Sequence, residues 1–142
     1  MDWDEIESLK KAGHEIGNHS QSHLYMMDLS EQEFVSQVSV ARDEIVSKLG
    51  SVDHFAWTYG RFFHFHKKWV KKIFELGHKS CASAERGAHG SFPIDSADAK
   101  ELVLRRDSIE INWPLQHLKY FLTKSTRSPI APQSSWAAQD KP

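Results

Sequence analysis

The segment AGHEIGNHSQSH, residues 12–23, decides how the fold of this chain is predicted. It follows an amphipathic run, so Gly13 is expected to end a helix, and Glu15-Ile16 is then predicted to form a short buried strand. Gly17-Asn18 supplies the break after which side chains can face a cleft. His19 and His23 are therefore expected at the C-terminal end of a strand, where α/β folds place their sites.

Two imidazoles four residues apart can bind one divalent ion, because neutral imidazole is the commonest metal ligand. Spacing alone is weak support: with nine histidines in 142 residues, about half of one such pair is expected by chance. The position after a predicted strand supplies context, and His19 and His23 are taken as candidate metal ligands. The alternative is that both are ordinary surface histidines.

Capping boxes predict the two helices that flank this segment. Asp2 with Glu5 begins a short helix before Gly13, and Ser30 with Glu33 begins a longer helix that Gly50 ends. Apolar residues recur at helical spacing in both. They are Trp3, Ile6 and Leu9 in the first helix, and Phe34, Val38, Ala41, Ile45 and Leu49 in the second.

Strands and helices are predicted to alternate along the rest of the chain. We expect strands over 54–58, 79–84 and 102–106, and helices over 69–76 and 114–122, with Lys67, Lys68, Lys71 and Lys72 forming a solvated face. Ile109 and Ile111 continue an apolar alternation. This order predicts a parallel α/β architecture. From residue 125 onward the composition predicts a disordered tail.

Composition indicates one globular domain and excludes several function classes. Hydrophobic residues make up 39% of the chain and the net charge is −1, with dispersed basic residues. Nucleic-acid binding and a polybasic membrane patch are therefore disfavoured. Cys81 is the only cysteine, which rules out an intrachain disulfide, and it is expected in the core. The acidic start and the lack of a long apolar run favour a cytoplasmic protein, or a chain that begins partway into a longer one.

Three segments together resemble the polysaccharide deacetylase family, the NodB-homology domain of carbohydrate esterase family 4. They are Trp3-Asp4-Glu5-Ile6, then residues 13–23, then Phe55-Ala56-Trp57-Thr58-Tyr59-Gly60. The resemblance runs from residue 3 to about residue 122. Its most specific part is the family pattern H-[ST]-x-x-H, which His19, Ser20 and His23 match in full.

The resemblance implies a distorted (β/α) barrel that removes acetyl groups from acetylated oligo- or polysaccharides with Zn²⁺ or a similar divalent ion. It implies that His19 and His23 are metal ligands and that the Ser20 hydroxyl holds their loop. It also implies that the backbone N–H of Tyr59 stabilises the oxyanion of the tetrahedral intermediate.

The chain departs from the family pattern at two positions near Tyr59. Ala56 and Thr58 stand where the family usually has arginine and proline. Arg106 resembles an arginine that some branches carry late in the barrel, and it is expected to substitute, in preference to Arg105. The alternative is that both are surface arginines. The family's late histidine has no match, because His117 has the wrong spacing.

The family takes its catalytic base and third metal ligand from aspartates on an early strand, and nothing precedes Met1 here. His64 and His66 are weak candidates for a third ligand. We therefore expect residues 1–124 to be the C-terminal part of a (β/α) barrel that lacks its first strands. Its open edges would favour association between copies.

Two functions stay open at this stage. One is a metal-dependent polysaccharide deacetylase, a hydrolase of carbon–nitrogen bonds, present in a truncated and inactive form. The other is a non-catalytic carbohydrate- or metal-binding α/β module derived from that fold. An unrelated α/β protein with an incidental histidine pair is the remaining alternative.

Overall fold

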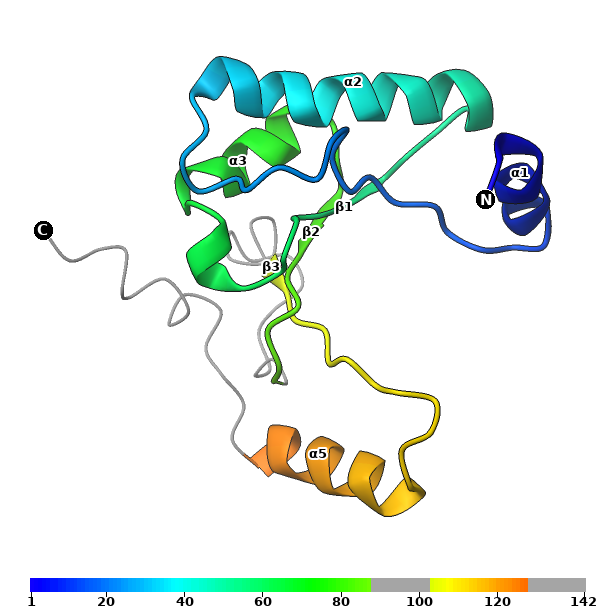
Figure 1. The fold of residues 1–142 in the computed structure, drawn as a ribbon, viewed down its shortest axis with the longest axis vertical. Helices are drawn as coiled ribbons and strands as arrows, with labels where there is room; N and C mark the ends of the chain where they lie inside the picture. The colour runs from blue at the N-terminus through cyan, green and yellow to red at the C-terminus, as the bar shows by residue number, and fades with distance from the viewer. Residues whose placement is uncertain (88–102, 128–142) are drawn as a thin grey trace, which may run out of the picture.

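The computed structural model describes residues 1–87 and 103–127, and the remaining residues lie outside this description (Figure 1). The helices are α1 (Trp3–Lys11), α2 (Glu31–Leu49), α3 (Lys68–Glu75) and α5 (Leu115–Arg127), with a 3-10 turn, η1 (Phe62–His64). The strands are β1 (His54–Ala56), β2 (Ser80–Ala82) and β3 (Val103–Leu104). The predicted mixture of helices and strands is confirmed.

The strands form one parallel sheet in the order β1-β2-β3. Phe55 lies opposite Cys81, and Cys81 lies opposite Val103. Parallel neighbours need a crossover connection, and α3 supplies it between β1 and β2. Among the described residues the sheet is open, with helices α2 and α3 together on one side of it (Figure 1). The larger barrel stays a prediction.

The core lies between the sheet and these two helices. Phe34 of α2 is fully buried and stacks on Trp69 of α3, with ring centroids 4.4 Å apart. Trp57, just past β1, stacks on Phe65 at 4.6 Å. Cys81 is fully buried, as predicted, and burial raises the pKa of its thiol. Such a thiol is a core residue and not a nucleophile.

Both predicted capping boxes are confirmed. The Asp2 carboxylate accepts from the Glu5 N–H, and the Ser30 hydroxyl accepts from the Glu33 N–H. Gly50 ends α2 in the left-handed region, with φ of 82°. These local signals fixed the helix starts because each is made within four residues of chain.

The strand predicted at Glu15-Ile16 is wrong. Glu15 is exposed and Ile16 is only half-buried, and neither belongs to a strand. Pairing with β1 begins at Asn18, as a single parallel bridge to Phe55. It ends there because Ser20, with φ of 68°, turns the chain away from the sheet. The histidine segment therefore lies against β1 as a loop, not as a strand.

The region after β3 also differs from the expectation. Ile109 is 54% exposed and Ile111 is fully exposed, so their alternation marks no buried strand. Helix α5 continues to Arg127, past residue 125, where the tail was expected to begin. The predicted tail over 128–142 lies outside the described residues. No helix in the described ranges has the length and apolar character needed to cross a bilayer.

Candidate functional site

His19 is fixed at the C-terminal end of β1. Its Nδ1 lies 2.8 Å from the carbonyl oxygen of Ala56, the last residue of that strand. Since a carbonyl only accepts, Nδ1 carries the proton and donates it. The second nitrogen, Nε2, is then the one with a free lone pair. A backbone carbonyl that fixes the tautomer in this way is the usual support of a metal-binding histidine.

His23 is held beside His19 by the turn between them. The Ser20 hydroxyl accepts the backbone N–H of His23 at 3.0 Å, so its predicted role in holding the loop is confirmed. Both Ser20 and His23 have positive φ, which tightens the turn. The two imidazole centroids lie 5.0 Å apart. Two imidazoles bound to one Zn²⁺ at about 2.1 Å would be about 5 Å apart, so the pair fits a shared ion.

Asn18 anchors this loop to the core, a role that the sequence analysis missed. It is 1% exposed. Its Nδ2 donates to the Val38 carbonyl of α2 at 2.9 Å and lies 3.2 Å from Nε2 of His78, while its Oδ1 accepts the Ser20 N–H at 3.0 Å. Asn18 therefore ties the start of the histidine loop to α2 and to the segment before β2.

Replacing Asn18 with alanine is expected to weaken both the fold and the loop. The Val38 carbonyl and the Ser20 N–H would lose their partner, at a cost of about 1–3 kcal/mol. The loosened loop should lower Zn²⁺ affinity by about 10- to 100-fold. Urea denaturation and zinc titration would measure both effects. Gln21→Ala, exposed in the same loop, is the control, and equal effects of the two substitutions would contradict the anchoring role.

His78 is the buried partner of Asn18, with 4% of its surface exposed. Burial lowers its pKa; the nearby Ile73 carbonyl opposes this effect and Arg42 adds to it. The ring is therefore neutral in the folded protein at neutral pH. With Nδ1–H directed to the Ile73 carbonyl, Nε2 is left to accept from Asn18.

Stability is expected to fall as the pH drops below about 6.5, the usual pKa of an unfolded histidine. Below that value the unfolded chain binds a proton at His78 that the folded chain resists, so the free energy of unfolding decreases. Denaturation at several pH values should show this slope, and His78→Gln should reduce it, because glutamine keeps an acceptor but does not titrate. An unchanged slope in the variant would assign the effect to other groups.

Tyr59 lies three residues beyond β1, beside the histidine pair, as expected. Its ring centroid is 4.8 Å from that of His23. It has φ of 61°, and among the described residues no hydrogen bond engages its backbone N–H. Thr58, where the family usually has proline, is fully buried, and its hydroxyl donates to the Leu24 carbonyl at 2.6 Å. That bond joins the Tyr59 loop to the histidine loop.

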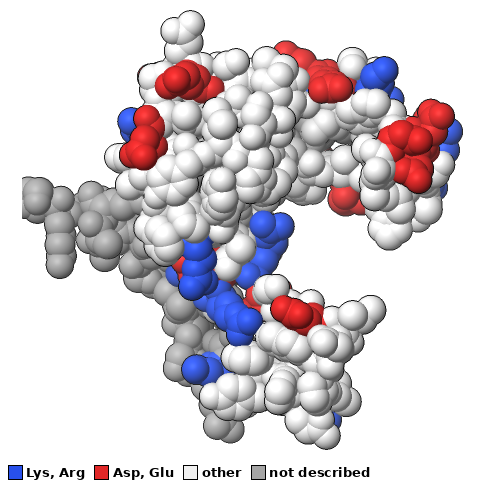
Figure 2. Space-filling model, viewed as in Figure 1, with Lys and Arg blue, Asp and Glu red and all other residues white. Residues whose placement is uncertain are grey.

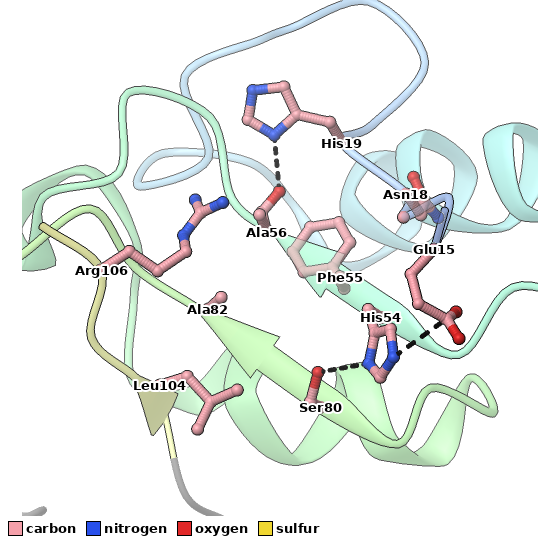
Figure 3. A pocket seen from close by; sticks show the side chains of 11 residues that line it. Glu15, Asn18, His19, His54, Phe55, Ala56, Ser80, Ala82, Leu104 and Arg106 are labelled. Atoms are coloured by element: carbon pink, nitrogen blue, oxygen red, sulfur yellow. Dashed lines mark hydrogen bonds and ion pairs between the residues drawn. The ribbon is translucent and has the colours of Figure 1, made fainter. Parts of the chain in front are cut away.

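An open cavity of about 620 Å³ lies on the side of the sheet away from α2 and α3 (Figures 1 and 3). His19 and Arg106 line the end where the strands finish. Arg106 Nε donates to the Ser83 carbonyl at 2.8 Å, which fixes its direction. The sequence placed Arg106 at this mouth, and the structure puts it in the same cavity as His19. Tyr59 does not line this cavity.

The other end of the cavity holds a second polar group. His54 Nδ1 lies 2.9 Å from the Ser80 hydroxyl, and His54 Nε2 lies 3.9 Å from the Glu15 carboxylate (Figure 3). His54 and Ser80 are the first residues of β1 and β2. This group is therefore separated from His19 by the length of the sheet.

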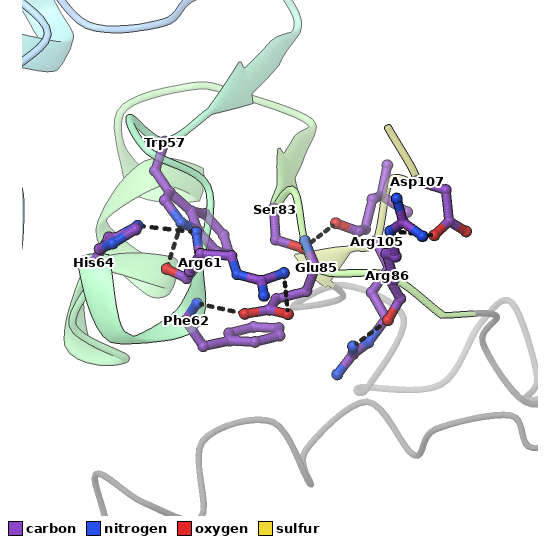
Figure 4. A network of polar contacts seen from close by, with 10 residues as sticks. Trp57, Arg61, Phe62, His64, Ser83, Glu85, Arg86, Arg105 and Asp107 are labelled. Atoms are coloured by element: carbon purple, nitrogen blue, oxygen red, sulfur yellow. Dashed lines mark hydrogen bonds and ion pairs between the residues drawn. The ribbon is translucent and has the colours of Figure 1, made fainter. Parts of the chain in front are cut away.

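Arg105 points elsewhere. It donates to the Arg86 carbonyl at 2.9 Å and lies over the Phe62 ring (Figure 4). Burial lowers its pKa, which Glu85 partly opposes. The preference for Arg106 over Arg105 as the cavity residue therefore agrees with the geometry.

The described residues supply two metal ligands and not three. Across residues 1–87 and 103–127, no group of three His, Cys, Asp or Glu side chains is close enough to hold one ion. His64 contacts the ring of Tyr59, and its Nδ1 accepts the Arg61 N–H. His66 Nδ1 accepts the Lys68 N–H. Neither completes the pair.

Comparison with known proteins relates this geometry to one family. A family model described as polysaccharide deacetylase matches residues 1–80. No curated protein matches the sequence. Among solved structures, the Streptococcus pyogenes deacetylase PplD in complex with acetate is similar, with a TM-score of 0.69 and 18% identity. The similarity covers 85% of this chain and 50% of that chain, so the chain spans about half the length of the structure that it matches.

Proposed function

Because the chain belongs to the polysaccharide deacetylase family, we propose that it carries the histidine part of a metal-dependent site that removes acetyl groups from an acetylated oligo- or polysaccharide. The observation that supports this most is the His19–His23 pair at the end of β1, with centroids 5.0 Å apart and His19 oriented by a carbonyl. Zn²⁺ is the ion that two imidazoles favour.

In this proposal His19 and His23 hold the ion and the substrate's acetyl group lies beside it. A divalent ion held there would polarise the acetyl carbonyl as a Lewis acid. The Ala56 carbonyl keeps the proton of His19 on Nδ1, and the Ser20 hydroxyl keeps the backbone of His23 in its turn. Both supports act on the ligands before substrate arrives, as preorganised sites require.

Tyr59 is proposed to act through its backbone N–H. As the acetyl carbonyl becomes tetrahedral, negative charge develops on its oxygen, and a fixed N–H donor lowers the energy of that state. The positive φ of Tyr59 and the buried bond of Thr58 to Leu24 hold this amide in place. Its side chain contributes separately, through contact with His23.

Arg106 is proposed to orient an acidic group or the substrate at the cavity mouth. Its Nε is engaged with Ser83, so the terminal nitrogens of the guanidinium are the ones available to the cavity. A planar guanidinium can bind a carboxylate through two parallel hydrogen bonds. This would replace the arginine that the family usually has at the position of Ala56.

The proton-transfer group and a third ligand must come from outside the described residues. Hydrolysis needs a base to take a proton from the attacking water, and the described part of the chain puts no carboxylate with the histidine pair. We therefore propose that the polypeptide of residues 1–142, tested by itself, binds metal and does not turn over. The same observation favours the second candidate, a non-catalytic carbohydrate- or metal-binding module.

Acetate release from N-acetylchitotetraose tests the proposal. We expect turnover, with Zn²⁺ present, from the protein together with any in-frame residues that its gene places before Met1, and none from residues 1–142 alone. A chelator and the double variant His19→Ala/His23→Ala should each abolish it. Zinc binding without turnover by the longest form would favour the binding module. Turnover that survives both the chelator and the double variant would refute the metal site.

A further inference from the structure

A row of exposed aromatic side chains leads away from the histidine pair. We call it the aromatic strip and define it by Tyr25, Tyr59, Phe63 and His64. We infer that this strip binds the sugar chain of a neutral, N-acetylated polysaccharide and positions one sugar at His19 and His23. The inference rests on the proposed function, because it assigns the surface that would deliver substrate to that site.

The rings are in continuous contact. Phe63 and His64 have centroids 4.2 Å apart, and His64 lies 5.5 Å from Tyr59 and 5.6 Å from Tyr25. Tyr59 then reaches His23 at 4.8 Å. The strip is built from two loops, the histidine loop and the loop after β1. Both loops also carry the proposed metal ligands and the oxyanion donor, so the strip is continuous with the site.

The exposure of these rings is unusual for apolar side chains. Phe63 is 62% exposed and Tyr59 is 54% exposed, although Phe65, two residues further along, is fully buried. Leaving a large aromatic ring in water gives up the free energy that its burial would provide. Contiguous exposed apolar surface with polar groups around it marks a binding site more often than plain surface does.

The strip is rigid. The Tyr25 hydroxyl donates to the Phe63 carbonyl at 2.8 Å, which joins the two loops. Figure 4 shows the network beneath η1, in which the Trp57 indole donates to the Arg61 carbonyl and Arg61 pairs with Glu85 at 3.1 Å. Rings that are already ordered lose little conformational freedom when a ligand binds.

Sugar chemistry fits this surface. One face of a pyranose ring presents C–H groups that pack on aromatic faces, and its rim presents hydroxyl and acetamido groups that hydrogen-bond to Tyr and His side chains. Arg61 is neutralised by Glu85, so it adds no unpaired charge beside the strip. Figure 2 shows mostly uncharged surface over residues 18–30, with charged residues gathered at its margins. A neutral sugar chain suits this surface better than a nucleic acid or an acidic peptide does.

Calorimetric titration with N-acetylchitotetraose tests the inference. Phe63→Ala removes an exposed ring and should leave the fold intact, and we expect it to weaken binding by about five- to tenfold. Tyr120→Ala is the matched control, because Tyr120 is 59% exposed and lies on α5. It should bind like the wild type. Equal affinity of the two variants, or no binding by the wild type, would overturn the inference.

Two further measurements separate this inference from the proposed function. Phe63→Ala should keep the Zn²⁺ affinity of the wild type, whereas His19→Ala/His23→Ala should lose zinc and keep most of its affinity for the tetrasaccharide. Loss of zinc binding alone would therefore count against the metal site and not against the strip. Sedimentation completes the test: a dimer that Phe63→Ala dissociates would show that the strip binds a second copy of the chain, and would overturn the sugar assignment.

Discussion

Replacing His19 and His23 together with alanine is expected to lower the Zn²⁺ affinity of residues 1–142 by about 100-fold or more, because direct ligands matter at least as much as their supports. The wild-type affinity should itself be weak, since a zinc site in an enzyme usually has three protein ligands and the described residues bring two together. The single variants should lose most of the affinity, because one imidazole cannot chelate.

Competition with a chromogenic chelator would measure these affinities. Wild-type affinity should fall as the pH drops through about 6.5, because protonated imidazole has no lone pair for the ion. His14→Ala is the control, since His14 is exposed and precedes the loop. Tight binding that the double variant retains would show that the ion sits elsewhere in the chain.

Replacing Phe34 with alanine should produce the largest loss of stability. Phe34 is fully buried and stacks on Trp69 at an interplanar angle of 6°, between α2 and α3. Truncating such a ring leaves a cavity and costs about 3–5 kcal/mol. That is a large share of the 5–15 kcal/mol, roughly, by which a domain is stable. The Trp69 indole also donates to the Met26 carbonyl at 3.0 Å, so the histidine loop should lose support as well.

Urea denaturation of Phe34→Ala against Val40→Ala would isolate the core contribution. Val40 is on the same helix and is 41% exposed, so its replacement should change the free energy of unfolding by only about 0.5 kcal/mol. Comparable losses in the two variants would mean that the helix itself, and not the Phe34–Trp69 contact, dominates the stability.

Local signals in the sequence predicted several parts of the fold correctly. The capping boxes at Asp2 and Ser30 placed the starts of α1 and α2, and the motif around His19 led to the family. Each of these depends on residues within a few positions of one another. Spacing of this kind is visible without knowing where the chain folds back, so the sequence by itself is sufficient.

The error at Glu15-Ile16 arose where a short apolar pair had no local signal to distinguish strand from loop. An apolar pair can begin a buried strand or lie half-buried beside one. The choice was made by β1, which pairs only with Asn18, and by the positive φ of Ser20. Both depend on a segment more than thirty residues away, which no window on the sequence includes.

The motif determined which histidines to examine, and only the tertiary structure decided how they are held. Asn18 and His78 are separated by 60 positions and meet inside the core. Thr58 reaches Leu24, and the Tyr25 hydroxyl reaches the Phe63 carbonyl, across similarly long stretches of chain. These contacts join loops whose residues have no common period. Helix caps follow from local geometry, whereas the positions of Arg106 in the cavity and of Phe63 on the strip follow from packing of the sheet against α2 and α3.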